Sequence, residues 1–472
     1  MSGTFDVSRD EILRGSIPRV VLVLSIPLVV QNLFAIAQLV VDLFWLGRYS
    51  SESVAAVGLV TPVFNILIAA VLFTPFVGTQ ILVSQRYGEE DDYGAKLAAF
   101  NGIVLALGLG LLGGLVGYFG APTMIGFVDS LHPGDTDTEV FPLAIAYLQL
   151  LSLGLFLGAV SDVSEAAFIG RGDVRASLYL NVVAVSVNLT LDPFLIFGLG
   201  PFPELGIEGA ALASICGYGS GVLLAVFFVS RGRAGGIVST GAARLERETL
   251  AAVADIGFPT AVQNAGQKTV HLVLIVLVFA SGGAAAVLAY TVGGRIASLA
   301  SVPANGIQNA TQSIVGQNAG ASNEKRVDLT TLTAAAFGVT ILAVAAFVQF
   351  VAAESIVTFF VPKATGEERA LAVDYLRILA ISYPAIGAIY MFRAGFNGLG
   401  QTRISLGSSL LEYWITRLPL AGIGVFYVGM GPHAVFWAVT ISTVVAAIAT
   451  ATYYGYRRWR MYASRESDAT PA

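Results

Sequence analysis

The sequence predicts an all-α, polytopic membrane protein, because its composition is apolar, its charges are clustered and its two halves repeat. Of its 472 residues, 56 % are apolar and 12 % are charged, and the mean hydropathy is +0.76. Soluble domains average about 45–50 % apolar and about 25 % charged residues. The charges lie between apolar stretches of roughly 20 residues, the length that a helix needs to cross a bilayer. This composition excludes a soluble globular domain.

Twelve membrane-spanning helices can be drawn through these stretches. The first is expected to be a retained helix, because no small-residue cleavage pattern follows it. Prolines inside several longer spans predict tilted or kinked helices. The predicted spans are 18–46, 53–83, 97–120, 141–168, 176–199, 207–230, 252–280, 284–316, 332–352, 370–397, 403–428 and 433–456.

The distribution of basic residues predicts the orientation of the chain in a plasma membrane. Eighteen Lys and Arg residues lie in the termini and even-numbered loops, whereas three lie in the odd-numbered loops. The positive-inside rule then places both termini in the cytoplasm. The expected parts are a cytoplasmic N-terminus (1–17), an N-terminal lobe of six helices (18–230), a cytoplasmic linker (231–250), a C-terminal lobe of six helices (251–457) and a cytoplasmic tail (458–472).

The chain also repeats itself at an offset of about 230 residues. The segment "IPLVVQN" recurs as "FPTAVQN" at an offset of 232, and "GRGDVRAS" recurs as "GLGQTRIS" at an offset of 228. Because each half has an even number of spans, both halves enter the membrane from the same side, as in the parallel repeats of secondary transporters. The matched stretches are 26–32 with 258–264, 80–88 with 312–320, and 170–177 with 398–405.

Several classes of function are excluded by what the sequence lacks. With Cys216 as its one cysteine, the chain can form neither an internal disulfide nor a thiolate metal cluster. Its three histidines have no zinc-binding spacing. No Gly-Lys-Ser/Thr phosphate loop is present, and the bases are too dispersed for a nucleic-acid partner. We therefore expect neither an enzyme nor a bound cofactor.

Two spans of the first half each carry a polar stripe that ends in an aspartate. Both stripes have the spacing i, i+7, i+11, which places the three side chains within about 20° of one line along a helix. Placing polar and charged side chains inside a membrane span costs free energy, so such residues are expected to have a structural or functional role. The stripes are Gln31, Gln38 and Asp42 in the first span, and Asn181, Asn188 and Asp192 in the fifth.

Four polar side chains are expected at one depth, roughly 6–11 Å below the outer surface at ~1.5 Å per residue. They are Asp42, Tyr147, Asp192 and Ser214. Together with Asn188, this layer offers oxygen ligands of the kind that hard cations prefer. Two nearby carboxylates resist ionising together, so the layer could take either Na⁺ or a proton, in competition. The alternative is a set of hydrogen bonds that only pack the helices.

Asp162 and Glu165 lie near the inner end of the fourth span. We expect them to pair with Arg171 or Arg175, in a structural or gating role. The second half differs, since it holds the within-span bases together with some acids, for which structural ion pairs are the favoured interpretation. These bases are Lys268, Arg295, Arg377, Arg393 and Arg417, accompanied by Gln267 and Glu412.

These stretches resemble the multidrug and toxic compound extrusion (MATE) family, in its prokaryotic, DinF-like branch. The resemblance rests on "IPLVVQN…VDLFWLG" in the first span, "GRGDVR" and "NLTLDPFLIFGLG" around the fifth, "GIEGAALAS" in the sixth and the "GLGQTR" repeat. It implies a coupling-cation site made by Asp42, Tyr147, Asn188, Asp192 and, with Ser in place of Thr, Ser214. Some relatives have an acid in the seventh span, where this sequence has Gln267 and Lys268.

The resemblance implies an antiporter that exports amphipathic, cationic organic compounds in exchange for Na⁺ or H⁺. Its two halves would form a V that opens alternately to either side, and the protein would act as a monomer in lipid. One alternative is a lipid-linked saccharide flippase of the same superfamily, which should offer bases to a pyrophosphate. Another is an intramembrane aspartyl enzyme with Asp42 and Asp192 as its dyad, which would leave the repeat unexplained.

Overall fold

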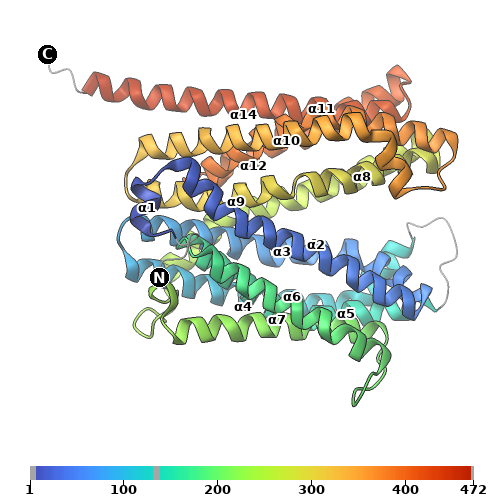
Figure 1. Cartoon of the computed structure of the whole chain (residues 1–472), viewed down its shortest axis with the longest axis horizontal. Coiled ribbons are helices and arrows are strands. Elements are labelled where there is room, and N and C mark those ends of the chain that lie inside the picture. The colour runs from blue at the N-terminus through green and yellow to red at the C-terminus, as the bar shows by residue number, and fades with distance from the viewer. Residues whose placement is uncertain (1–6, 131–138, 469–472) are drawn as a thin grey trace. The chain divides into compact units, whose positions relative to one another are not determined.

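The computed structural model describes residues 7–130 and 139–468, and within these ranges every regular element is a helix (Figure 1). The predicted all-α membrane fold is confirmed. Residues 1–6 and 469–472 of the predicted cytoplasmic ends lie outside the described residues, as does the stretch 131–138 between the third and fourth predicted spans.

The chain divides into two compact units. Unit 1 contains residues 1–16, 26–265 and 316–323, and unit 2 contains residues 17–25, 266–315 and 324–472. The helices up to residue 235 are α1 (Arg9–Arg14), α2 (Ile17–Tyr49), α3 (Ser51–Gly88), α4 (Asp92–Ser130), α5 (Val140–Gly170), α6 (Val174–Phe197), α7 (Ile207–Ser230) and the short η1 (Arg233–Gly235). The remaining helices are α8 (Arg247–Ala300), α9 (Val302–Gly320), α10 (Glu324–Phe360), α11 (Gly366–Gly398), α12 (Thr402–Leu410), η2 (Leu411–Arg417), α13 (Leu418–Ile423), η3 (Gly424–Val428) and α14 (Pro432–Asp468).

Ten of the described helices are long and apolar enough to cross a membrane. Three departures from twelve separate spans have local causes. The seventh and eighth predicted spans meet inside α8 at Gly283, whose φ of 61° is accessible to glycine and breaks the helix there. The eighth span is interrupted before α9, where Pro303 occupies the second helical position, at which its missing N–H is tolerated. The eleventh is divided by the π-helical turns η2 and η3.

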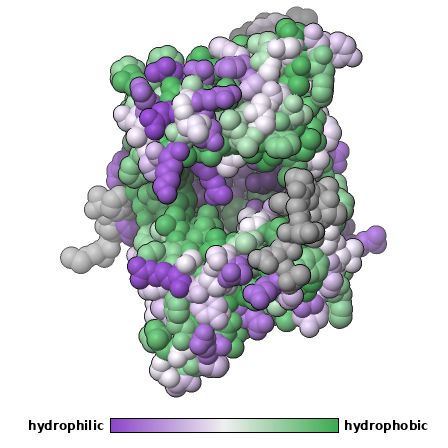
Figure 2. Space-filling view, turned by 90° about the vertical axis from the view of Figure 1, so that its right-hand side faces the viewer, coloured by the Kyte–Doolittle hydropathy of each residue, from purple (hydrophilic) through white to green (hydrophobic). Residues whose placement is uncertain are grey.

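Apolar residues are exposed over part of the face drawn in Figure 2, and large apolar side chains are exposed on many of the described helices. Phe119, Phe359 and Leu223 are 75 %, 80 % and 72 % exposed, which would be unfavourable in water but is expected of side chains that face lipid. The protein is therefore a multi-pass membrane protein.

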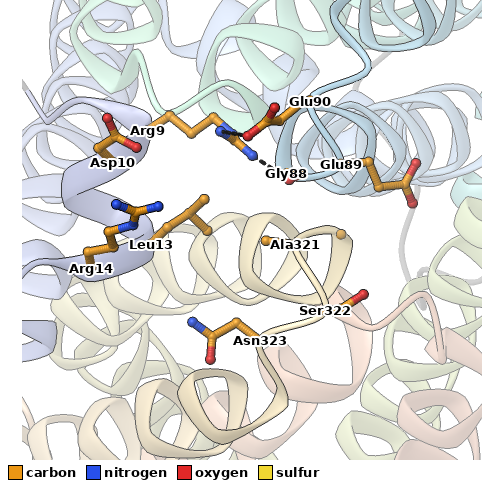
Figure 3. Close-up of a pocket in the computed structure, with 11 residues that line it drawn as sticks. Arg9, Asp10, Leu13, Arg14, Gly88, Glu89, Glu90, Ala321, Ser322 and Asn323 are labelled. Atoms are coloured by element: carbon orange, nitrogen blue, oxygen red, sulfur yellow. Dashed lines mark hydrogen bonds and ion pairs between the residues drawn. The ribbon is translucent and has the colours of Figure 1, made fainter.

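At one end of unit 1, the short helix α1 is held against the last turn of α3 (Figure 3). The Arg9 guanidinium donates to the carbonyl oxygens of Tyr87 (3.0 Å) and Gly88 (2.7 Å) and pairs with Glu90 at 2.9 Å. Ile12 on the same turn is completely buried. These contacts border a pocket of about 430 Å³ that the end of α9 also lines.

The ends of α3 and α9, which correspond to each other in the sequence repeat, touch through two glycines. A Cβ atom added to Gly88 would lie 2.1 Å from the carbonyl oxygen of Gln317, and one added to Gly320 would lie 1.9 Å from that of Gln85. The two contacts are reciprocal, because residue 88 corresponds to 320 and residue 85 to 317 at the offset of 232. Only glycine at both positions allows the two backbones to approach so closely. We call this contact the glycine crossing.

Candidate ion-coupling site in unit 1

Helices α2, α6 and α7 bring five of the predicted site residues together. One end of the Asn188 amide lies 3.2 Å from the Ser214 hydroxyl, and the other lies 3.2 Å from an Asp42 carboxyl oxygen and 2.9 Å from the Gln38 amide nitrogen. With its nitrogen oriented toward Asp42, the amide donates to that carboxyl group and accepts from Ser214. The cluster of Gln38, Asp42, Asn188, Asp192 and Ser214 is called the outer cluster below.

Asp192 is the most unusual member of the outer cluster. It is completely buried on α6 and interacts with the carboxyl group of Asp42. Among the described residues, no amide or hydroxyl group donates a hydrogen bond to its carboxyl oxygens. A buried acid that meets another acid in place of a donor is costly when both are ionised, so these oxygens suit an added proton or a small cation. Within the described ranges, no group of three or more His, Cys, Asp or Glu side chains could hold a metal ion. A cation here would therefore also need amide and hydroxyl oxygens.

Two tyrosines border these acids, and only one of them was predicted from the sequence. Tyr147 on α5 interacts electrostatically with Asp42 and Asp192, as its predicted depth implies. Tyr218 on α7 interacts with Asp42 and also with Asp162. It lies four residues after Ser214, on the same face of the helix, and this spacing could have identified it.

A second set of polar side chains lies on α2, α5 and α6. Gln31 of α2 donates a hydrogen bond to Glu165 of α5. The Ser177 hydroxyl of α6 lies 3.0 Å from the Gln31 amide oxygen and 3.3 Å from the Glu165 carboxyl group. Asp162, one turn before Glu165, interacts electrostatically with it. Gln31, Asp162, Glu165 and Ser177 are called the inner cluster below.

The expected pairing of Glu165 with Arg171 is wrong. Arg171 instead pairs at 2.6 Å with Asp92, at the start of α4, and its guanidinium lies over the Tyr87 ring. Six residues separate Glu165 from Arg171, which corresponds to about 240° around a helix, so the two side chains point in different directions.

Asn181 occupies α6 between the two clusters, and its amide oxygen is buried without a partner in the described part of the chain. Ser177, which sequence reasoning missed, lies four residues before Asn181 on the same polar stripe. The stripe on α6 is thus one helical turn longer than predicted.

Unit 2 has the opposite charge character. Glu412 accepts from Arg393 through one oxygen and from Arg417 through the other, both at 2.8 Å, and all three side chains are buried. The expected Glu412–Arg417 pair is therefore present, within a larger group. Gln267 of α8 donates to the Ser409 hydroxyl of α12 at 3.5 Å.

The sequence profile of the MatE family matches residues 27–194 and 259–423, that is, both halves of the chain. The chain belongs to the MATE family. The two matches begin 232 residues apart, which is the offset of the internal repeat.

Curated relatives cover this MATE chain almost completely. It is 24 % identical to the probable multidrug resistance protein YpnP of Bacillus subtilis, over 95 % of this chain and 97 % of that protein. It is 23 % identical to an FAD transporter of Shewanella oneidensis, over 93 % and 95 % of the two chains. Among solved structures, it resembles the outward-facing conformation of a multidrug resistance MATE transporter, with 25 % identity, a TM-score of 0.85 and coverage of 97 % and 99 %.

Proposed function

We propose that this MATE protein is a secondary antiporter that exports amphipathic organic compounds in exchange for Na⁺ or H⁺. The observation that carries the proposal is the outer cluster, in which the buried carboxyl group of Asp192 receives no hydrogen bond from an amide or hydroxyl among the described residues and interacts with the carboxyl group of Asp42. The protein would work as a monomer in the plasma membrane, with both termini in the cytoplasm, as the distribution of basic residues favours.

The coupling ion would act by stabilising one conformation of the outer cluster. A proton on Asp192 would relieve the repulsion between its carboxyl group and that of Asp42, and a bound Na⁺ would do the same by adding positive charge. The Asn188 amide and the Ser214 hydroxyl can supply two further oxygens. The ion can shift the conformational equilibrium only by its difference in affinity for the two states. The membrane potential adds about 2.3 kcal/mol per charge per 100 mV to this drive.

The named relatives support export of organic compounds over the alternatives. One of the two relatives described above is named for multidrug resistance and the other for FAD transport, so each name refers to organic compounds. A saccharide flippase and an intramembrane aspartyl enzyme are less well supported, because neither name describes such an activity. The sequence favoured cationic substrates, which the half-buried Asp42 and the buried Asp192 of unit 1 would suit.

The proposal is tested by replacing the acids in reconstituted protein. We expect Asp42→Asn and Asp192→Asn to abolish export of a fluorescent organic cation from proteoliposomes driven by an imposed Na⁺ or pH gradient. Glu208→Gln, which changes an exposed acid at the start of α7, should transport normally. Normal coupled transport by a well-folded Asp42→Asn protein would refute the assignment of the site.

A further inference from the structure

The last helix of unit 2 is longer than a single bilayer crossing requires. Helix α14 has 37 residues, which correspond to about 55 Å at 1.5 Å per residue. The hydrocarbon core of a bilayer is about 30 Å thick. Apolar residues predominate in α14 up to residue 456, and the turn that follows carries Arg457, Arg458 and Arg460. This end of α14 is therefore expected to lie at the polar edge of the membrane or beyond it.

Contacts with two neighbouring helices hold this end of α14 in place. The buried carboxyl group of Asp328, in the second turn of α10, accepts from the Tyr454 hydroxyl at 2.9 Å and pairs with the Arg458 guanidinium at 2.8 Å. Arg457 donates a hydrogen bond to the side chain of Gln401, which immediately precedes α12. The starts of α10 and α12 and the end of α14 therefore form one surface of unit 2.

Positive charge predominates on this surface. In residues 324–328, 401–403 and 454–461, six side chains are basic and two are acidic. One of the two acids, Asp328, is buried and already paired with Arg458. The six bases, four of which are exposed, are called the basic end below: Lys325, Arg326, Arg403, Arg457, Arg458 and Arg460.

Three of these bases lie where a helix dipole disfavours them. Lys325 and Arg326 are in the first turn of α10, together with Glu324. Arg403 is in the first turn of α12, which contains no acid. The N-terminus of a helix carries partial positive charge, so a base in this position becomes more favourable when an anion lies nearby. The placement of these bases therefore favours an anionic partner.

The equivalent end of unit 1 is more nearly neutral. Three acids occupy positions 89–91 before α4, whereas the equivalent residues 321–323 before α10 are Ala, Ser and Asn. Asp92, the first residue of α4, pairs with both Lys96 and Arg171 at 2.6 Å. The excess of positive charge at the basic end is therefore a property of the second half and not of the repeated fold.

Two exposed aromatic rings lie among these bases. Trp459 is 67 % exposed and Tyr456 is 51 % exposed, with ring centres 6.4 Å apart. Tryptophan and tyrosine are enriched where a membrane meets water, because the ring is apolar while its polar group can stay hydrated. Lys and Arg near the membrane are attracted to anionic headgroups. The combination fits a lipid surface better than a small soluble anion, which would have no use for the exposed rings.

We propose that the basic end binds the headgroups of anionic phospholipids in the bilayer around the protein. Arg457 and Arg460 would pair with lipid phosphates, while Trp459 and Tyr456 would lie at the level of the headgroups. The ion pair of Arg458 with Asp328 would keep the helix end in position. This interaction goes beyond the proposed export function, and lipid binding can be measured without any transport.

Two phospholipids with identical acyl chains test the proposal, anionic phosphatidylglycerol and zwitterionic phosphatidylcholine. Native mass spectrometry of the full-length protein, released from detergent micelles that contain both lipids, measures the affinity for the tightest-bound molecule of each. We expect the wild type to prefer phosphatidylglycerol. Arg457→Gln combined with Arg460→Gln should weaken phosphatidylglycerol binding about 25-fold, roughly fivefold for each positive charge removed, and leave phosphatidylcholine binding unchanged. Arg460→Gln alone, which keeps the contact of Arg457 with Gln401, should weaken it about fivefold.

Arg244→Gln combined with Arg247→Gln is the matched control, because it removes the same charge from two exposed arginines of unit 1, just before and at the start of α8. This control should bind both lipids as the wild type does. A wild type without a preference for phosphatidylglycerol would overturn the proposal, as would a preference that persists when Arg457 and Arg460 are both replaced. An equal loss of preference in the control would also overturn it, because the protein would then attract the lipid through its overall charge.

Discussion

Replacing Glu412 by glutamine should destabilise unit 2 strongly, because this side chain is the shared partner of two buried guanidinium groups. Its side chain is 5 % exposed, each of its oxygens accepts from an arginine at 2.8 Å, and Thr443 also donates to it at 3.3 Å. Glutamine keeps the shape but removes the negative charge, and its NH₂ group would face a guanidinium donor. Two arginines would then remain buried without a counter-charge.

Breaking a buried ion pair by neutralising one partner costs about 3–5 kcal/mol. One kcal/mol lowers the melting temperature by about 2–4 °C in a domain of 150–250 residues, so we expect a fall of roughly 6–20 °C. The protein is heated in detergent, and size-exclusion chromatography measures how much of it remains monodisperse at each temperature. Glu354→Gln, which changes an exposed acid on α10, should melt as the wild type does. A loss of stability of about 1 kcal/mol would lower the melting temperature by at least about 2 °C. If Glu412→Gln melts within about 2 °C of the wild type, the two arginines do not depend on this carboxylate.

Three further predictions concern unit 1 and the glycine crossing. Ser214→Ala should raise the ion concentration needed for half-maximal transport several-fold, whereas Ser214→Thr should retain activity. Equal activity of the wild type and both variants would exclude this hydroxyl from the site. Gly320→Ala should lower the melting temperature by several degrees, because the added Cβ would overlap the backbone carbonyl of Gln85. Gly294→Ala, at a position with open space, should melt as the wild type does, and similar melting temperatures of the two variants would contradict the close backbone contact at the glycine crossing. If Na⁺ is the coupling ion, titration with Na⁺ should change the fluorescence of Trp45, which lies three residues after Asp42 on α2. The apparent affinity for Na⁺ should weaken as the pH falls, because protons compete for the two carboxyl groups, and a Na⁺ response that persists in Asp192→Asn would place the ion elsewhere.

Helical periodicity was sufficient to predict the polar residues that share a face. Gln38 and Asp42 on one helix, and Asn188 and Asp192 on another, were identified because a spacing of seven and eleven residues keeps side chains on one line. Their role in coupling stays a prediction. Tyr218 was missed because a tyrosine in an apolar span is usually part of the packing, and its neighbours become known only when α5 and α7 are placed together.

Contacts over long sequence distances could not be predicted in the same way. The partner of Arg171 depends on where α4 begins relative to the end of α5, and nothing within either segment specifies this. Similarly, Gly88 and Gly320 were recognised as equivalent positions of the repeat, but sequence comparison alone does not reveal that equivalent positions touch each other.

The glycine crossing has a consequence for the origin of the chain. A contact in which residue 88 meets residue 317 while residue 320 meets residue 85 is self-complementary, which is the property of an interface between two identical subunits related by a two-fold axis. A protein consisting of one six-helix half would already carry both sides of this surface and could dimerise through it. After duplication and fusion of such a gene, the same surface would serve within a single chain, and each glycine would have to be retained for the benefit of the other repeat.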